Sequence, residues 1–281
     1  MKIARFERGG QIRLGVLDKS ETRIQALPAS ITDIRPLITE GVPASDGEWI
    51  DLSKVRLLAP VPQTPRNIIC VGKNYREHAR EFARSGFEAG ATTDVDPFPA
   101  VFTKPSSAII GPGDEVELHS GVTQAVDYEG ELALVIGKPG RAIRKEDAYK
   151  HVWGYMIVND VTARDRQKNH KQWFLGKSLD TFCPMGPLIA TADEVDPENL
   201  EVRTWVNGEL RQSANTRDLI FDIPTLIETI SAAMTLMPGD VIATGTPAGV
   251  GIGFNPPKFL KAGDEVRISI DGLGTLTNTF V

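Results

Sequence analysis

The sequence predicts an α+β protein that is rich in strands, with a small N-terminal α/β module before a larger domain. Short runs of apolar and β-branched residues outnumber the segments with helical spacing, and the two kinds do not alternate regularly. A doubly wound nucleotide-binding fold requires such alternation, so we expect mixed β-sheets instead. The 281 residues, 41% hydrophobic and 24% charged, suffice for one large core and a small satellite.

The N-terminal module is expected to span residues 1–60. Lys2–Glu7 and Gln11–Leu17 have strand composition and are separated by two glycines, which is a hairpin signal. The polar stretch Ile31–Gly47 follows. Ala59–Pro65 then contains three prolines, each of which restricts its neighbour to extended conformations. We expect this segment to be a stiff linker, with the larger domain over residues 66–281.

The larger domain is expected to consist mainly of short strands. Asn207-Gly208 predicts a two-residue turn between two of them, because both positions tolerate positive φ. Helical spacing indicates three helices, Tyr75–Arg84, Thr162–Trp173 and Thr225–Met234. The predicted strands share β-branched and apolar residues and are Asn67–Val71, Ala100–Thr103, Val126–Ile136, Val152–Asn159, Glu201–Val206, Val241–Thr244 and Val266–Ile270.

Charge and hydropathy argue against several classes of protein. The net charge is −6 without a basic stripe, which disfavours nucleic-acid binding. No run of about 18 apolar residues is present, and Met1–Asp18 lacks the apolar region of a secretory signal, so we expect a cytoplasmic protein without a membrane segment. Cys70 and Cys183 have no CxxC spacing and are expected to be buried thiols.

Acidic residues at the ends of two apolar runs indicate a metal site. Glu129 and Glu131 are two residues apart, so on an extended chain they point to the same side. Asp160 follows the apolar run 155–158 in the same way. Adjacent carboxylates repel and need a cation, a shared proton or solvent. Three oxygen donors without Cys or His suit Mg²⁺ or Mn²⁺, although a solvated acidic strand end is the alternative.

A second candidate lies in the predicted helix over residues 75–84. His78 and Glu81 are three residues apart and therefore meet on one helical face. A carboxylate that orients an imidazole makes a competent general base. Such pairs are also ordinary on exposed helices, so a solvated pair is the alternative. The following segment Ser85–Pro99, rich in Gly, Thr, Asp and Pro, is expected to act as a mobile lid.

Two glycine-containing motifs resemble nucleotide-binding signatures without satisfying them. Gly176-Lys177-Ser178 has Lys171 where a P-loop needs glycine. Gly245–Gly253 follows a strand but leads into Phe254–Pro257, through which no helix can start. A glycine-rich turn beside a small-molecule site stays open for this segment. The other histidines lack metal-ligand spacing and are expected to be structural or solvated: His119, His151 and His170.

Several segments together resemble the fumarylacetoacetate hydrolase family from about Asn67 to the C-terminus. Their order and spacing agree throughout, and they are Ile69–Tyr75, Phe102–Pro105, Asp127–Glu131, Asn159–Asp165, Gly176–Asp180 and Ala243–Pro247. The resemblance implies a β-rich roll of mixed sheets, commonly a homodimer, with a small domain in front. It also implies a divalent ion, Mg²⁺ or Mn²⁺, held by Glu129, Glu131 and Asp160.

The resemblance further assigns roles around that ion. It implies that His78 and Glu81 lie on a lid that orders over the substrate, and that Lys177 lies beside the metal. The residues that it implies as facing the substrate are Lys104, Arg164, Gln167 and Thr246.

The substrate class that the resemblance implies is the small 2-oxo acids. Hydrolysis of an acylpyruvate-like β-diketo acid through a metal-stabilised enolate is the first expectation. Oxaloacetate decarboxylation and isomerisation of 2-hydroxyhepta-2,4-diene-1,7-dioate or 5-carboxymethyl-2-hydroxymuconate are alternatives. A metal-binding scaffold without activity is the non-enzymatic alternative, but it would not require His78, Glu81 and Lys177 together.

Overall fold

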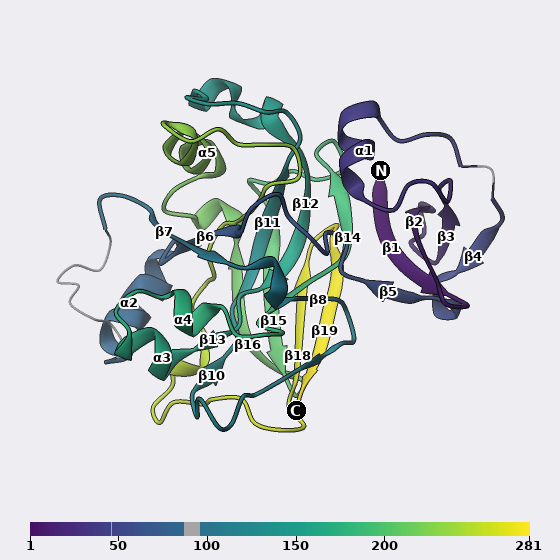
Figure 1. Ribbon diagram of the computed structural model, residues 1–281. Coiled ribbons are helices and arrows are strands. Elements are labelled where there is room, and N and C mark those ends of the chain that lie inside the picture. The colour runs from purple at the N-terminus through teal and green to yellow at the C-terminus, as the bar shows by residue number, and fades with distance from the viewer. Residues whose placement is uncertain (46, 87–95) are drawn as a thin grey trace.

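The structure is a computed structural model that describes residues 1–45, 47–86 and 96–281 (Figure 1). Its largest sheet contains β1 (Lys2–Arg8), β2 (Gln11–Leu17), β3 (Arg23–Ala26), β4 (Trp49–Asp51), β5 (Arg56–Leu58), β6 (Ile68–Gly72), β7 (Ala100–Lys104), β8 (Ile109–Ile110), β11 (Gly130–Ile136), β12 (Val152–Asn159), β14 (Cys183–Thr191) and β17 (Val241–Ala243). The order is β4-β3-β2-β1-β14-β12-β11-β17-β6-β7, with β5 beside β1 and β8 beside β14. The strand-rich α+β class is therefore confirmed.

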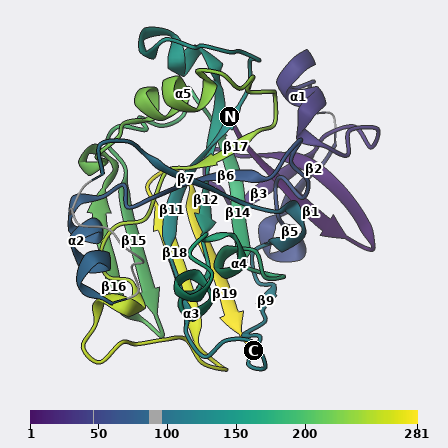
Figure 2. The same cartoon turned by 60° about the vertical axis from the view of Figure 1, so that its left-hand side comes forward.

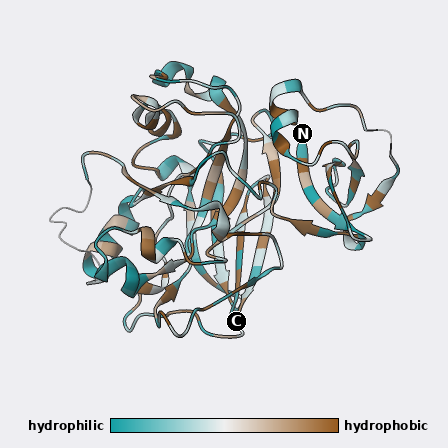
Figure 3. Ribbon diagram, in the orientation of Figure 1, coloured by the Kyte–Doolittle hydropathy of each residue, from teal (hydrophilic) through white to brown (hydrophobic). Residues whose placement is uncertain are grey.

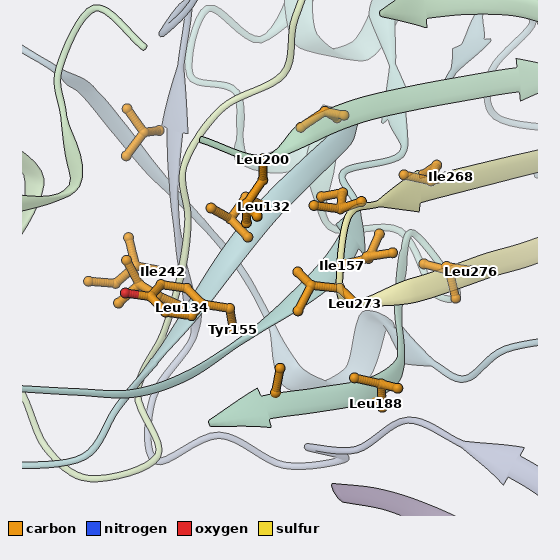
Figure 4. Packing of buried hydrophobic residues seen from close by; sticks show 14 of the residues in the cluster. Leu132, Leu134, Tyr155, Ile157, Leu188, Leu200, Ile242, Ile268, Leu273 and Leu276 are labelled. Carbon is orange, nitrogen blue, oxygen red and sulfur yellow. The ribbon is translucent and has the colours of Figure 1, made fainter. Parts of the chain in front are cut away.

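A second sheet packs against the centre of the first. It is formed by β9 (Glu115–Val116), β15 (Glu201–Val206), β16 (Glu209–Asn215), β18 (Glu265–Ile270) and β19 (Gly274–Phe280), and a short ladder joins β10 (Val126–Asp127) to β13 (Thr162–Ala163). Alternate residues of β15 and β18 are buried, as expected for strands with one face on a core. Leu132, Tyr155 and Ile268 meet in this core (Figure 4).

Strand β11 is buried on both faces, which explains its unbroken apolar sequence. Leu132 and Leu134 belong to the core between the two sheets, whereas Ala133 and Val135 belong to a second core on the opposite face. Because successive side chains alternate, every position of the strand faces protein. Figure 3 shows the same concentration of hydrophobic residues on the central strands. The strand is therefore a rigid support for the residues at its beginning.

The helices lie outside the sheets, as α1 (Ile34–Glu40), α2 (Arg76–Arg84), α3 (Arg164–Asn169), α4 (Phe174–Lys177) and α5 (Ile223–Ser231). Helix α5 is capped by Asp222, whose carboxylate accepts a hydrogen bond from the Thr225 amide at 2.8 Å. It buries Leu226, Ile227 and Ile230. Among the described helices, none has the length and apolar character needed to cross a membrane.

Several predicted elements agree with the structure, and two do not. Val152–Asn159, Glu201–Val206 and the turn after it are confirmed. The single strand Val126–Ile136 is wrong, because β10 ends at Asp127 and β11 begins at Gly130. The single helix Thr162–Trp173 is also wrong: its first two residues pair with β10 as β13, and α3 then ends at Asn169.

The N-terminal strands continue the central sheet directly. Lys2 and Ile3 of β1 pair with Ala190 and Ile189 of β14. In Figures 1 and 2, β1 to β5 therefore lie beyond β14, on the side away from α2. The segment Ala59–Pro65 was expected to form a linker. Its first three residues, Ala59, Pro60 and Val61, are buried.

Candidate active site and metal centre

Three carboxylates from two neighbouring strands converge at one end of the central sheet. Glu131 lies in β11, Glu129 precedes that strand, and Asp160 follows β12. The pairing of β11 with β12 places them together, and the Asp160 amide donates to the Glu129 carbonyl at 2.8 Å. One oxygen of each carboxylate lies within 4.8 Å of the others, and all three side chains are buried. The alternative interpretation, a solvated acidic strand end, is therefore wrong.

Cationic side chains surround two of the three acids. Lys177 Nζ lies 2.8 Å from Glu129 Oε2 and 2.7 Å from Asp160 Oδ2. Arg164 Nη1 lies 2.7 Å from the other Glu129 oxygen. Glu131, in contrast, forms no ion pair within the described part of the chain and accepts a hydrogen bond from the Gly245 amide at 2.8 Å. Of the three acids, Glu131 is thus the one without a cationic partner among the described residues.

The unequal surroundings separate the pKa values of the two glutamates. Burial alone would raise the pKa of Glu129, but Lys177 and Arg164 outweigh it and lower this pKa to about 2. Burial raises the pKa of Glu131 well above its usual range, and the charges of Asp160 and Glu129 raise it further. A divalent cation would supply the charge that Glu131 lacks. The three oxygen donors therefore fit a hard ion such as Mg²⁺ or Mn²⁺.

The basic pair lies on helix α2. His78 is only 3% exposed, and its Nδ1 lies 3.1 Å from Glu81 Oε2. The second oxygen of Glu81 accepts a hydrogen bond from the Gly249 amide at 3.0 Å. The solvated alternative for this pair is therefore wrong. Because Glu81 engages Nδ1, the other ring nitrogen of His78 is the one available to a reactant.

A narrow cavity lies between His78 of the basic pair and Glu129 of the acidic cluster, whereas Glu81, Glu131 and Asp160 are not part of its lining. Its polar lining contains most of the residues expected at the site, namely His78, Glu129, Arg164, Gln167, Lys177 and Thr246. The outer Arg164 nitrogen, Nη2, is buried and has no hydrogen-bond partner within the described residues. This nitrogen is therefore an unused donor in a residue that lines the cavity.

Lys104 does not line this cavity, contrary to the expectation that it faces the substrate. It is fully buried, and its ammonium donates to the carbonyls of Val161, at 2.9 Å, and Lys177. It also lies 2.7 Å from Asp160 Oδ1. The ammonium therefore forms two hydrogen bonds to carbonyls and one ion pair, all with buried groups. Lys104 therefore supports Asp160 from behind.

Two features of the site were not found in the sequence. Trp173 lines the cavity between Phe82, at a ring distance of 6.0 Å, and Phe102, at 5.3 Å. Asp127 is buried and holds the Arg164 guanidinium at 2.9 Å. The only signal for these two residues in the sequence was their position in or next to the segments that resemble the family. Most of the expected lid Ser85–Pro99 lies outside the described residues.

The family is shown by a match to the model described as "Fumarylacetoacetate (FAA) hydrolase C-terminal" over residues 67–281. The chain belongs to the fumarylacetoacetate hydrolase family. A second model, "Rv2993c-like, N-terminal", matches residues 1–60.

The similar proteins carry names of several activities, among them tautomerases, hydrolases and isomerases. The oxaloacetate tautomerase YisK of Bacillus subtilis is 58% identical, over 81% of this chain and 73% of that protein. The mitochondrial oxaloacetate tautomerase fahd2 of Xenopus laevis is 48% identical, over 84% of this chain and 72% of that protein. A solved fumarylacetoacetate hydrolase from Exiguobacterium antarcticum is 46% identical, with a TM-score of 0.88 over 100% of this chain and 99% of the other.

Proposed function

We propose that the protein interconverts the enol and keto forms of oxaloacetate or a closely similar 2-oxo dicarboxylic acid. The observation that carries this proposal is the buried Nη2 donor of Arg164, which has no hydrogen-bond partner in residues 1–45, 47–86 and 96–281. A second carboxylate on the substrate would provide the acceptor that this nitrogen lacks, because guanidinium groups bind carboxylates strongly. Relatives named oxaloacetate tautomerase, up to 58% identical, support the same substrate.

The acidic cluster would hold the reactive end of the substrate through a metal. A divalent ion bound by Glu129, Glu131 and Asp160 would polarise the 2-oxo group and stabilise negative charge on its oxygen. Lys177 adds a positive charge beside the same acids. Burial alone would lower its pKa, but the charges of Asp160 and Glu129 together outweigh burial and raise it. The ammonium therefore stays protonated and favours the enolate over the neutral ketone.

His78 and Glu81 would move the proton at C3. In the keto-to-enol direction, neutral His78 accepts a proton from C3, and the C–H electron pair becomes the C2=C3 bond. The carbonyl π pair moves onto the 2-oxo oxygen, and protonated His78 then releases its proton to that oxygen, directly or through water, so that atoms and charge balance and His78 is neutral again. Glu81 fixes the imidazole tautomer and stabilises its protonated form. The reverse steps return the keto form.

Hydrolysis of an acylpyruvate, the first expectation from the sequence, becomes the second candidate. The solved relative named fumarylacetoacetate hydrolase favours it. In that reaction His78 would deprotonate water for attack on the distal carbonyl, and the bond beyond C3 would break to release the pyruvate enolate. A distal ketone offers no charge to Arg164 Nη2, which is why we place this reaction second.

The deciding experiment compares three reactions with the same enzyme and Mg²⁺ or Mn²⁺. Loss of the enol form of oxaloacetate is followed by its ultraviolet absorbance, and pyruvate release is measured from oxaloacetate and from acetylpyruvate. The rates with metal but without enzyme are subtracted. We expect enol loss to be fastest, with little pyruvate. If pyruvate release from acetylpyruvate is fastest, the enzyme is a hydrolase. If pyruvate release from oxaloacetate is fastest, it is a decarboxylase. If none of the substrates is turned over, the protein is a metal-binding scaffold.

A further inference from the structure

A buried carboxylate outside the acidic cluster connects the two halves of the site. Asp127 is completely buried, and both of its oxygens accept hydrogen bonds. Oδ1 accepts from the amides of Gly251, at 2.6 Å, and Tyr128, at 2.9 Å. Oδ2 accepts from Arg164 Nε at 2.9 Å and from the Ile252 amide at 3.1 Å. One side chain therefore holds a glycine-rich turn and a cavity-lining arginine together.

The first connection from Asp127 leads to the acidic cluster. Asp127 holds Arg164 by Nε, and this orientation directs Nη1 to Glu129 at 2.7 Å. It leaves Nη2 without a hydrogen-bond partner in the part of the chain that the structure describes. Since a guanidinium is planar, fixing Nε also fixes the directions of the other two nitrogens. Asp127 thus sets the donor that we propose for the distal carboxylate.

The second connection leads to the basic pair. The Gly251 and Ile252 amides belong to a single 3₁₀ turn, Gly251–Gly253, which packs on α2. Just before this turn, the Gly249 amide donates to Glu81 Oε1 at 3.0 Å. At Gly253 the fit is closer still, because an added Cβ would lie 1.7 Å from that oxygen. Only glycine at this position leaves room for Glu81.

We infer that Asp127 and Gly253 are positioning residues for the proposed proton transfer. Asp127 anchors the turn, the turn receives Glu81, and Glu81 orients His78. The same carboxylate orients Arg164, so the proton carrier and the distal carboxylate donor are aligned by one group. Neither Asp127 nor Gly253 lines the cavity. The catalytic consequence rests on the function proposed above, whereas the attachment of α2 to the turn does not.

Two variants with matched controls test the inference on the Mg²⁺-loaded protein. Gly253→Ala displaces the flexible end of Glu81, and its control is Gly121→Ala, where an added Cβ meets nothing within 4 Å. Neither glycine has a positive φ, so backbone strain does not enter. Asp127→Asn removes one acceptor, and its control is Asp240→Asn, which alters a buried carboxylate that also holds an arginine Nε, at 3.0 Å.

We expect Gly253→Ala to lower kcat about 10²-fold with KM near the wild-type value, since it disturbs the general base alone. Asp127→Asn should lower kcat and also raise KM for enol-oxaloacetate, because Arg164 loses its orientation. Amide hydrogen exchange over residues 76–84 should accelerate in both variants and in neither control, and Mg²⁺ affinity should stay unchanged in Gly253→Ala.

The exchange measurement separates this inference from the proposed function. If the wild type turns over no 2-oxo acid, the proposed function fails, while faster exchange in α2 of Gly253→Ala still supports the attachment. Unchanged exchange and unchanged kcat in Gly253→Ala would overturn the inference. If Asp127→Asn does not fold, Gly253→Ala decides alone. Equal kcat losses in Gly253→Ala and Gly121→Ala would also contradict the role of Gly253.

Discussion

At the scale of single residues, Glu129 and Glu131 differ in what surrounds the same chemical group. Glu129 is paired with Lys177 and Arg164, at 2.8 and 2.7 Å. Glu131 faces two other carboxylates without an ion pair among the described side chains. Replacing the carboxylate has different consequences in these two environments, because Glu129 compensates two buried cations whereas Glu131 has no cation to compensate.

The two corresponding glutamine variants should therefore affect the stability of the metal-free protein differently. We expect Glu129→Gln to lower the free energy of unfolding by about 3 kcal/mol or more, since two buried cations lose a partner. Glu131→Gln should leave it unchanged or raise it. Thermal unfolding with a chelator measures both. Mg²⁺ should raise the melting temperature of the wild type and of neither variant; a Mg²⁺ response in Glu131→Gln would contradict its role as a ligand.

The raised pKa of Glu131 also predicts how metal binding depends on pH. The Glu131 carboxyl holds its proton more tightly in the folded metal-free protein than in the unfolded chain. The stabilisation of the folded state by this proton is therefore complete below the unfolded pKa and is lost as pH rises through the folded pKa. Mg²⁺ must displace the proton of Glu131 to bind. The affinity of the protein for Mg²⁺ should therefore increase as pH rises through the folded pKa of Glu131. Calorimetry in buffers of different ionisation enthalpy should show proton release. A pH-independent affinity would contradict this expectation.

At the scale of elements, helix α2 is attached to the rest of the site by a small separate cluster. Phe82 packs with Val250 and Ile252 and with the partly buried Trp173, apart from the two main cores. Such a small cluster stabilises the position of one helix more than the whole fold. The position of His78 therefore depends on a few aromatic contacts.

Replacing Trp173 by alanine should consequently affect activity more than stability. We expect kcat to fall at least tenfold because α2 no longer packs on the cavity wall, an effect of about 1.4 kcal/mol or more on the barrier. The melting temperature should change little. Trp173→Phe, which keeps an aromatic ring, is the matched control. A large loss of melting temperature without a loss of kcat would show that the residue supports the main core instead.

The sequence predicted those elements whose local pattern and environment agree. Strand β12 is an apolar run that is buried on both faces, and it was predicted with its observed bounds. Strand β14 was missed because Pro184, Gly186 and Pro187 disfavour a strand locally, although β12 and β1 pair with it. Strand β19 was missed because its Thr and Asn residues hide the alternating burial that the second sheet imposes.

The candidate site was predictable to a similar extent. The acids and the basic pair could be found because their spacing places them on one face of a strand or helix. Lys104 was misplaced, since only the three-dimensional structure shows that its donors are used behind Asp160. Asp127 and Gly253 could not be assigned a role, because their partners lie far along the chain.

At the scale of the whole molecule, the N-terminal module shares a sheet with the larger part of the chain. Ile3 of β1 is 1% exposed and pairs with Ile189 of β14. Both residues belong to the same buried core. A shared core and a continuous ladder couple the unfolding of the two parts.

We therefore expect a single melting transition for the whole chain. Ile3→Ala should lower the free energy of unfolding by about 2–5 kcal/mol, the usual effect of such a core truncation. Ile12→Ala, at a position that is 46% exposed, is the control and should have little effect. Differential scanning calorimetry measures both variants. Two separate transitions, with only the first shifted by Ile3→Ala, would show that the parts unfold independently.

The division of the site between a sheet and a helix also has an evolutionary consequence. Glu131 lies in β11 and Asp160 directly follows β12, the strand that pairs with it, whereas His78 and Glu81 lie on a helix that is held by a small separate cluster. Mutations can therefore accumulate around α2 without damaging the acidic cluster. Natural selection can thus change the residues around α2 separately from the acidic cluster, and the relatives of this one chain include proteins named as a tautomerase and as a hydrolase.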